Sequence, residues 1–145
     1  MTHVQFLTPG LALISWTTVM WLALYVTRIP AMKAARIHPE KARNHDDTWK
    51  QKLPSRVRSV AENYNHLHEQ PTLFYALMLT IAVTVGGSTV ASSLAWAYVA
   101  ARVLHSLVQV STAPVVARFF SFFIASLLLI ALTGHTWWRW MTTAG

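Results

Sequence analysis

The sequence predicts an all-α integral membrane protein built as a four-helix bundle, and three observations support this fold class. Charged residues are scarce, since the 145 residues include only 12 Lys or Arg and 5 Asp or Glu, whereas about a quarter of a soluble domain is charged. Apolar residues make up 54% of the chain, which is too hydrophobic for a disordered protein. Long segments without charge flank one long polar segment. A water-soluble globule is therefore not expected.

The charge-free segments predict where the membrane helices lie. They comprise residues 2–27, 70–101 and 119–138. A hydrocarbon core of about 30 Å needs about 20 mostly apolar residues in helical form. The first and last segments predict helices at about 6–27 and about 115–138. The middle segment contains the run Gly-Gly-Ser-Thr at 86–89, which is typical of a tight turn, so a further helix is expected at about 91–110.

The second helix is expected at about 55–85 and follows a polar loop at about 31–54. It begins after Pro54, because proline is favoured in a first helical turn. A helix of about 31 residues measures about 46 Å at 1.5 Å per residue, which exceeds the membrane. Its polar first half is therefore expected to project into the cytoplasmic interface or to line the interior of the bundle.

The basic residues predict the orientation of the chain. Eight of the twelve lie in one stretch, namely Lys33, Arg36, Lys41, Arg43, Lys50, Lys52, Arg56 and Arg58. Since cytoplasmic loops are rich in Lys and Arg, we expect loop 31–54 in the cytoplasm and both termini outside. A signal peptide is disfavoured, because the positive charge follows the first apolar segment. Anionic lipid accounts for the basic loop, and no nucleic-acid partner is expected.

Two groups of polar residues in the helices are candidates for a functional site. Glu62, His66 and Glu69 are spaced i, i+4 and i+7, so they share one helix face. In the third helix, Arg102 and His105 are three residues apart. A charged side chain within a span needs a partner away from lipid, so Arg102 is expected to pair with a glutamate or a ligand. An ion pair that only fixes helix packing is the alternative.

A metal site is a further alternative for the same residues. The chain has no Cys, which removes disulfides, thiolate metal sites and a Cys nucleophile. Carboxylates and imidazoles that face a bundle core can hold two metal ions. His68, however, points away from the face shared by Glu62, His66 and Glu69. We therefore expect no metal ligand.

Three short segments resemble one known family. Residues 61–79 read AENYNHLHEQPTLFYALML, residues 101–105 read ARVLH, and residues 118–123 read RFFSFF. In this order they are similar to the starts of the second and fourth helices and to the third helix of the MAPEG family (membrane-associated proteins in eicosanoid and glutathione metabolism), notably its microsomal glutathione transferases. Together with the length and the basic first loop, the resemblance covers essentially the whole chain.

The resemblance implies a homotrimer of four-helix subunits, with glutathione as co-substrate held between subunits near the cytoplasmic face. It also implies a bacterial-type member, and so a multi-pass protein of the bacterial inner membrane. The family motif in helix two is Arg-x-x-x-Asn-x-x-Glu shortly before a proline. Aligned on Glu69, the motif matches only at that residue, because Glu62 and His66 occupy its Arg and Asn positions. Arg58 or Arg56 could supply the missing cation from one turn earlier, and Asn63 or Asn65 could supply the missing amide.

The site expected from this resemblance has one catalytic residue, Arg102, which would stabilise the glutathione thiolate. The substrate-binding residues would be Arg58, Asn65, His66, Glu69, Tyr98 and His105. Glutathione carries two carboxylates, one ammonium and a thiol whose anion is the nucleophile. Guanidinium groups bind carboxylates through paired hydrogen bonds, and a carboxylate such as that of Glu69 would receive the ammonium.

The function expected is a glutathione-dependent transferase or peroxidase acting on lipophilic electrophiles that enter from the lipid. The alternative is a non-catalytic MAPEG-like membrane protein that binds another ligand or a partner protein, and the departures at Glu62 and His66 motivate it. The identity of the electrophile, and the choice between conjugation, peroxide reduction and isomerisation, are not encoded in any motif of the chain.

Overall fold

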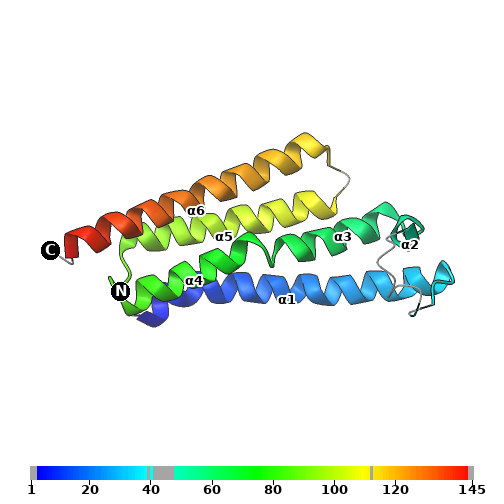
Figure 1. Cartoon of the computed structure of the whole chain (residues 1–145), viewed down its shortest axis with the longest axis horizontal. Helices are drawn as coiled ribbons and strands as arrows, with labels where there is room; N and C mark the ends of the chain where they lie inside the picture. Colours follow the sequence, from blue (N-terminus) through cyan, green and yellow to red (C-terminus); the bar gives the residue numbers. More distant parts are fainter. Residues whose placement is uncertain (1–2, 39, 41–47, 112, 144–145) are drawn as a thin grey trace.

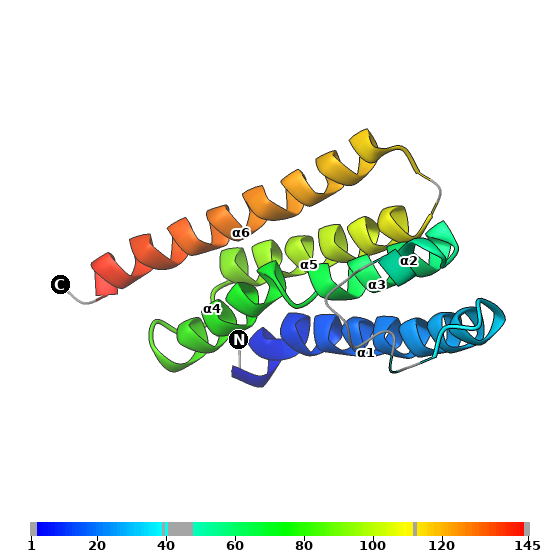
Figure 2. The same cartoon turned by 45° about the vertical axis from the view of Figure 1, so that its right-hand side comes forward.

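The structure, a computed structural model, describes residues 3–38, 40, 48–111 and 113–143, and within these it is all-helical with no strand. The helices are α1 (His3–Ala34), α2 (Thr48–Gln51), α3 (Ser55–His66), α4 (Gln70–Val83), α5 (Thr89–Val110) and α6 (Val115–Thr143). Figures 1 and 2 show α1, α5, α6 and the consecutive pair α3–α4 extended along one long axis. Helix α5 contacts α6, α1 and α3, so it occupies the middle of the molecule.

Two helices, α1 and α6, are long and apolar enough to cross a membrane. Most residues of their apolar stretches are not buried inside the chain. Side chains that are more than half exposed include those of Leu22, Val26, Val115, Ile130 and Trp137. Leaving apolar surface in water costs roughly 25 cal/mol per Å², so these surfaces favour a lipid environment. Helix α4 has only 14 residues and α5 carries a polar face, so neither is long and apolar enough by itself to cross a membrane.

The expected continuous helix at 55–85 is wrong, because it is broken between His66 and Gln70. Helix α3 ends at His66 and α4 begins at Gln70, with Pro71 in its first turn. A proline has no N–H to bond the carbonyl four residues earlier, and its ring clashes with that carbonyl. Pro71 therefore prevents an unbroken helix from passing through Leu67. The gap between α3 and α4 is visible in Figure 1.

Helix α1 extends seven residues beyond the expected end at 27. It continues through Pro30 to Ala34, and its last turns pack on a small second core. That core is formed by Ile37, Trp49, Leu53 and Val57. The expected loop 31–54 thus contains the end of α1 and the short helix α2, while 39 and 41–47 lie outside the described residues.

The main hydrophobic core lies where α1, α4, α5 and α6 face one another. In α1, the core residues Phe6, Leu13 and Met20 repeat every seven residues, so they lie on one face of the helix. The residues that meet them include Phe74, Met78 and Ile81 of α4, Ala91 and Ala95 of α5, and Leu129 and Leu132 of α6. This core fills the half of the molecule nearest the two termini.

Polar contacts fasten the turn between α4 and α5 to the end of α6. Arg139 Nη1 donates to the Gly86 carbonyl at 2.6 Å. Ser88 Oγ accepts from the Ala91 N–H at the start of α5 and lies 3.1 Å from His135 Nε2. A side chain that accepts from the first turn in this way is an N-cap. At the end of the molecule that carries both termini, side-chain hydrogen bonds therefore join the turn between α4 and α5 to α6.

A Gly87→Ala substitution is expected to destabilise this end of the fold. A Cβ at Gly87 would lie 2.7 Å from Phe6 Cγ and Cδ2 and 2.9 Å from Phe6 Cβ. Phe6 is fully buried, so the ring has no free space to enter, and overpacking of this kind costs about 1–3 kcal/mol. The measurement is the melting temperature of the purified protein in detergent. The matched control is Gly10→Ala, since nothing lies within 4 Å of a Cβ there. An equal melting temperature for the two variants would contradict the prediction.

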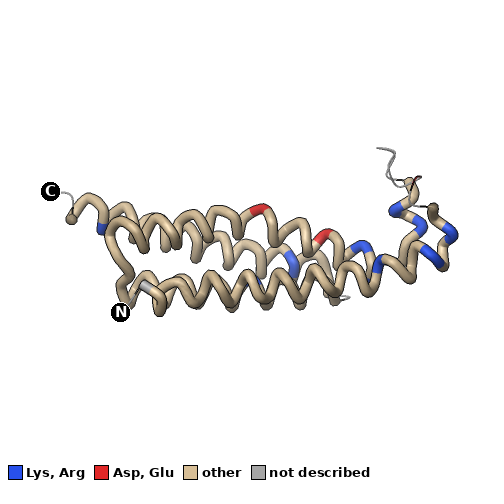
Figure 3. The backbone as a smooth tube through the Cα atoms, turned by 90° about the horizontal axis from the view of Figure 1, so that it is seen from below, with Lys and Arg blue, Asp and Glu red and all other residues tan. Residues whose placement is uncertain are grey.

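Charge is distributed unevenly along the molecule. Figure 3 shows most of the Lys and Arg residues gathered toward the end opposite the two termini. This end contains the last turns of α1, the helix α2 and the start of α3. The candidate site described below lies between this basic end and the apolar core.

Candidate functional site

Arg102 lies inside the chain and contacts the break between α3 and α4. Its side chain is 0% exposed, and Nη2 donates to the His66 carbonyl at 2.6 Å. In an unbroken helix this carbonyl would accept the Gln70 N–H instead. Among the described residues its Nε and Nη1 have no hydrogen-bond partner, so the expected pairing with Glu62 or Glu69 is not formed within the chain. Arg102 is a buried cation with unused donors.

His66 and His105 form a pair beside Arg102. Their rings are stacked with centroids 5.8 Å apart, and His66 Nδ1 lies 3.5 Å from His105 Nε2. His105 Nδ1 lies 3.0 Å from Ser121 Oγ, and that hydroxyl donates to the Arg118 carbonyl at 3.0 Å. His105 is buried, whereas His66 is partly exposed. The pair thus connects α3 to α6 through α5.

Phe122 of α6 contacts this cluster from one side. Its ring lies 6.3 Å from the His66 ring, 5.7 Å from the His105 ring and 5.7 Å from the Arg102 guanidinium carbon. A cation over an aromatic face is stabilised by the ring quadrupole, by about 2 kcal/mol when water is excluded. Phe122 therefore supplies part of the environment that a carboxylate was expected to supply.

Gln70 connects Tyr98 to α6 on the other side of the break. Its Nε2 donates to Ser126 Oγ at 2.8 Å, and its Oε1 accepts from the Tyr98 hydroxyl at 3.4 Å. Tyr98 is fully buried, with its ring 4.5 Å from that of Phe74. Of the expected site residues, Arg102, Tyr98, His105 and His66 are thus brought into one interior cluster.

Arg58 and Asn65 lie elsewhere, in a cleft between α1, α2 and α3 with a volume of about 450 Å³. The polar residues that line it are Arg28, Lys50, Gln51, Arg58, Glu62 and Asn65. Apolar residues complete the lining, namely Leu24, Leu53, Val57 and Ala61. The cleft therefore combines three cations with one carboxylate, a charge pattern that complements a ligand with more negative than positive groups.

Some of the polar side chains in the cleft are held by contacts with other residues, whereas others are exposed. The Arg28 guanidinium carbon lies 5.1 Å from the centre of the Trp49 ring, which holds it at the cleft wall. Glu62 Oε2 accepts from Gln109 Nε2 at 3.3 Å, so this carboxylate is positioned by α5. Arg58 and Asn65 are exposed. Glu69 is exposed as well, at the break, and is not among the residues that line the cleft.

An apolar groove of about 680 Å³ lies between α4 and α6. It is lined mainly by apolar side chains such as Leu73, Leu77, Ile130 and Trp137. Leu73 is one helical turn beyond Gln70, and Ile130 is one turn beyond Ser126. The groove therefore ends next to the hydrogen bond between Gln70 and Ser126, and through it next to the interior cluster.

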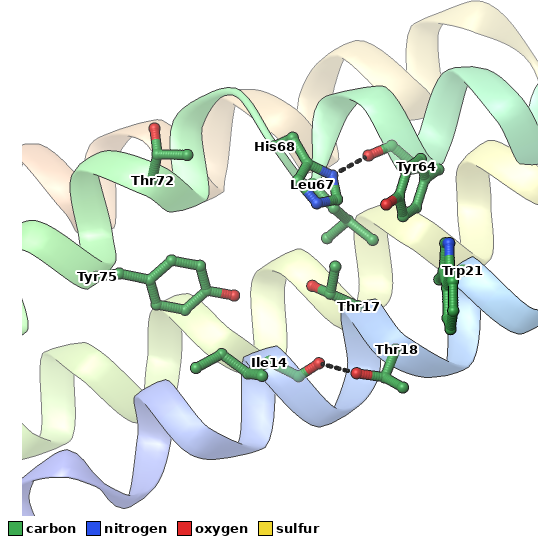
Figure 4. A pocket seen from close by; sticks show the side chains of 9 residues that line it. All are labelled: Ile14, Thr17, Thr18, Trp21, Tyr64, Leu67, His68, Thr72 and Tyr75. Atoms are coloured by element: carbon green, nitrogen blue, oxygen red, sulfur yellow. Dashed lines mark hydrogen bonds between the residues drawn. The ribbon is translucent and has the colours of Figure 1, made fainter.

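A smaller cavity of about 290 Å³ lies on the opposite side of α3–α4, against α1 (Figure 4). Tyr64, Tyr75 and Thr17 are among the residues that line it. His68 also lines it, and His68 Nδ1 lies 2.9 Å from the Tyr64 carbonyl. His68 thus faces away from His66. Within the described ranges, no group of three or more His, Asp or Glu residues is arranged to hold a metal ion.

Several residues in and around the interior cluster were not predicted from the sequence. Gln70, Gln109, Ser121 and Ser126 each bond a residue on another helix. One signal was present for Gln109, because Tyr98, Arg102, His105 and Gln109 are spaced i, i+4, i+7 and i+11 and so line one face of an otherwise apolar helix. Asn63, one of the two candidates for the amide of the family motif, is 0% exposed, and its amide has no hydrogen-bond partner among the described residues.

Neither curated protein sequences nor solved structures gave a match to the chain. The model of the MAPEG family, in contrast, matches residues 6–138, from the first turn of α1 to the tryptophans near the end of α6. Because this match spans nearly all of the chain, the protein belongs to the MAPEG family.

Proposed function

We propose that the protein is a membrane-embedded glutathione-dependent transferase or peroxidase that acts on lipophilic electrophiles. The observation that carries the proposal is the charge pattern of the cleft between α1, α2 and α3. Glutathione has two carboxylates and one ammonium, and the cleft offers Arg28, Lys50 and Arg58 to the carboxylates and Glu62 to the ammonium. Family membership supports a glutathione-related activity in general.

The second substrate would approach from the lipid through the groove between α4 and α6. The groove is apolar and ends beside Gln70 and Ser126, so a lipophilic molecule in it would lie close to the interior cluster. Arg102, whose Nε and Nη1 have no hydrogen-bond partner in the part of the chain that the structure describes, would stabilise the thiolate of glutathione. The reaction joins the sulfur to the electrophile, or in the peroxidase case reduces a hydroperoxide with two molecules of glutathione.

The proposed assembly is a homotrimer of four-span subunits in a bacterial inner membrane. Both termini would lie outside and loop 31–54 in the cytoplasm, because the basic residues gather at the end opposite the termini. Exposed polar residues at the level of the break, such as Glu69 and Asn65, support an assembly, since such side chains are costly against lipid. A neighbouring subunit would cover them, and glutathione would lie between subunits.

The test is an activity and binding assay on the purified protein in lipid nanodiscs. We expect turnover with glutathione and an aryl halide or an organic hydroperoxide, and a calorimetric heat of binding for glutathione. S-methylglutathione is the control, because it keeps the charged groups but has no free thiol, so it should bind without turnover. The proposal is wrong if glutathione gives neither heat nor product.

A second candidate function is a non-catalytic MAPEG protein that binds another ligand or a partner. The observation that favours it is the hydrogen bond between Glu62 and Gln109, which gives Glu62 a structural contact where the family motif has an arginine. This candidate predicts a folded, assembled protein without any glutathione-dependent signal. The same calorimetric experiment distinguishes the two candidates.

A further inference from the structure

We propose that His66 accepts the proton of the glutathione thiol and that His105 and Ser121 hold it in the tautomer that can do so. The proposal rests on the proposed function and adds a proton acceptor to it. His66 is not part of the glutathione motif, in which its position is an asparagine. Its partly exposed ring and its contact with the buried His105 set it apart from the other imidazoles of the chain.

The hydrogen bonds assign the protons step by step. Ser121 gives its only hydroxyl proton to the Arg118 carbonyl, so its Oγ can only accept from His105 Nδ1. His105 therefore carries its proton on Nδ1. In the neutral ring Nε2 is then an acceptor, so a hydrogen bond across the 3.5 Å to His66 Nδ1 requires His66 Nδ1 to be the donor. The lone pair of His66 is left on Nε2.

The charged groups around the two rings come from three sides. Helix α5 contributes Arg102 and α6 contributes Arg118, whereas Glu62 lies one turn before His66 and Glu69 lies three residues after it. Helix α1 presents Arg28 to the cleft that Glu62 also lines. A second buried positive charge on His105 would lie one helical turn from the guanidinium of Arg102, which favours the neutral tautomer used above.

His66 lies between the cleft and the apolar groove along the chain, although it is not among the residues that line either one. Glu62, which lines the cleft, is one helical turn before His66, and Leu73, which lines the groove, follows it by seven residues. In the proposed step the S–H bond of glutathione breaks, its electron pair stays on sulfur, and the proton forms an N–H bond at His66 Nε2. The thiolate then attacks the electrophile, its leaving group departs, and His66 returns the proton to water.

The experiment compares His66→Gln with His68→Gln, a matched substitution two residues away. His68 faces the other side of α3, next to Tyr64, so its loss should leave catalysis unchanged. For His66→Gln we expect glutathione binding within about threefold of wild type, but a fall of about 100-fold in kcat at neutral pH, as is typical for loss of a general base. The thiolate absorbance of bound glutathione should fall in parallel and recover at alkaline pH.

A second pair of variants tests the positioning role of His105. A glutamine at this position keeps an acceptor for His66 Nδ1–H near the site of Nε2, whereas a phenylalanine keeps the ring shape without an acceptor. We therefore expect the pH profile to be preserved in His105→Gln and lost in His105→Phe. In wild type, ¹⁵N NMR of labelled histidine should show His66 protonated on Nδ1 and His105 protonated on Nδ1.

The outcomes separate this inference from the proposed function. If His66→Gln keeps both kcat and the thiolate signal, His66 is not the proton acceptor, although glutathione turnover would still support the enzyme. The opposite tautomer of His66 in the wild-type spectrum would overturn the inference even if a variant failed to fold. Absence of glutathione binding by wild type would overturn both proposals.

Discussion

Arg102→Met is expected to abolish glutathione-dependent turnover while the melting temperature stays about the same. Arg102 is fully buried without a carboxylate partner, and its burial costs several kcal/mol. Methionine has a similar length and no charge, so it removes that penalty. It also leaves the His66 carbonyl without its donor, which costs about 1–3 kcal/mol. The lost contact with the Phe122 ring adds about 2 kcal/mol to this cost. Because these losses are similar in size to the burial penalty that is removed, the variant should be about as stable as wild type.

The effect on activity should be much larger. Removal of a group that stabilises a developing anion typically lowers kcat by about 10²–10³. Both quantities can be measured on one preparation, by scanning fluorimetry in detergent and by turnover with an aryl halide. Arg102→Lys is the informative companion, because it keeps the charge but not the guanidinium geometry. A sharp drop in melting temperature for Arg102→Met with activity retained would indicate a structural role instead.

Charge reversal in the cleft should weaken glutathione binding by about 100-fold or more. The double variant Arg28→Glu and Arg58→Glu removes two cations from the lining. Each charge-assisted hydrogen bond contributes about 1.5–3 kcal/mol, so two of them contribute at least about 3 kcal/mol. That corresponds to about two powers of ten in Kd. Calorimetry with glutathione measures the change directly.

The control for this prediction has the same change in charge outside the cleft. Lys33 and Lys52 are exposed and do not line it, so Lys33→Glu with Lys52→Glu tests the general electrostatic effect. Arg58→Glu alone serves as a second variant, because Arg28 also contacts Trp49 and its loss affects the small core there. Equal weakening by the cleft variant and the control would show that no specific anion site exists.

The helical nature of the chain and the position of most helices could be predicted from the sequence, because charge-free segments and the Gly-Gly turn act locally. The start of α6 at Val115 and the end of α5 at Val110 are set by Pro114 and its neighbours. The break at residues 67–69 could also have been predicted, because Pro71 follows it closely in the sequence. It was not predicted, because a polar half followed by an apolar half is compatible with one long helix that leaves the membrane, and the hydrophobic pattern says nothing about a missing N–H.

The candidate site was harder to predict, because its contacts join residues far apart in the chain. Spacing suggested that Glu62, His66 and Glu69 share one helix face, but α3 ends at His66, so Glu69 lies outside that helix. Spacing also could not show which neighbour each residue would meet. Glu62 bonds Gln109 and Arg102 bonds a carbonyl, so the expected ion pair did not form. A backbone carbonyl becomes available to a side chain only when a helix is interrupted. Sequence spacing alone carries no information on that.

The break between α3 and α4 also changes the electrostatics of the molecule. Each helix has a macrodipole equivalent to about half a positive charge at its N-terminus and half a negative charge at its C-terminus. By splitting one helix in two, Pro71 creates a negative pole at the end of α3 and a positive pole at the start of α4. Arg102 lies at the negative pole and Glu69 precedes the positive one, so each side chain is opposite in charge to the helix end beside it and is stabilised by it. One proline thus provides a partial counter-charge for a buried guanidinium.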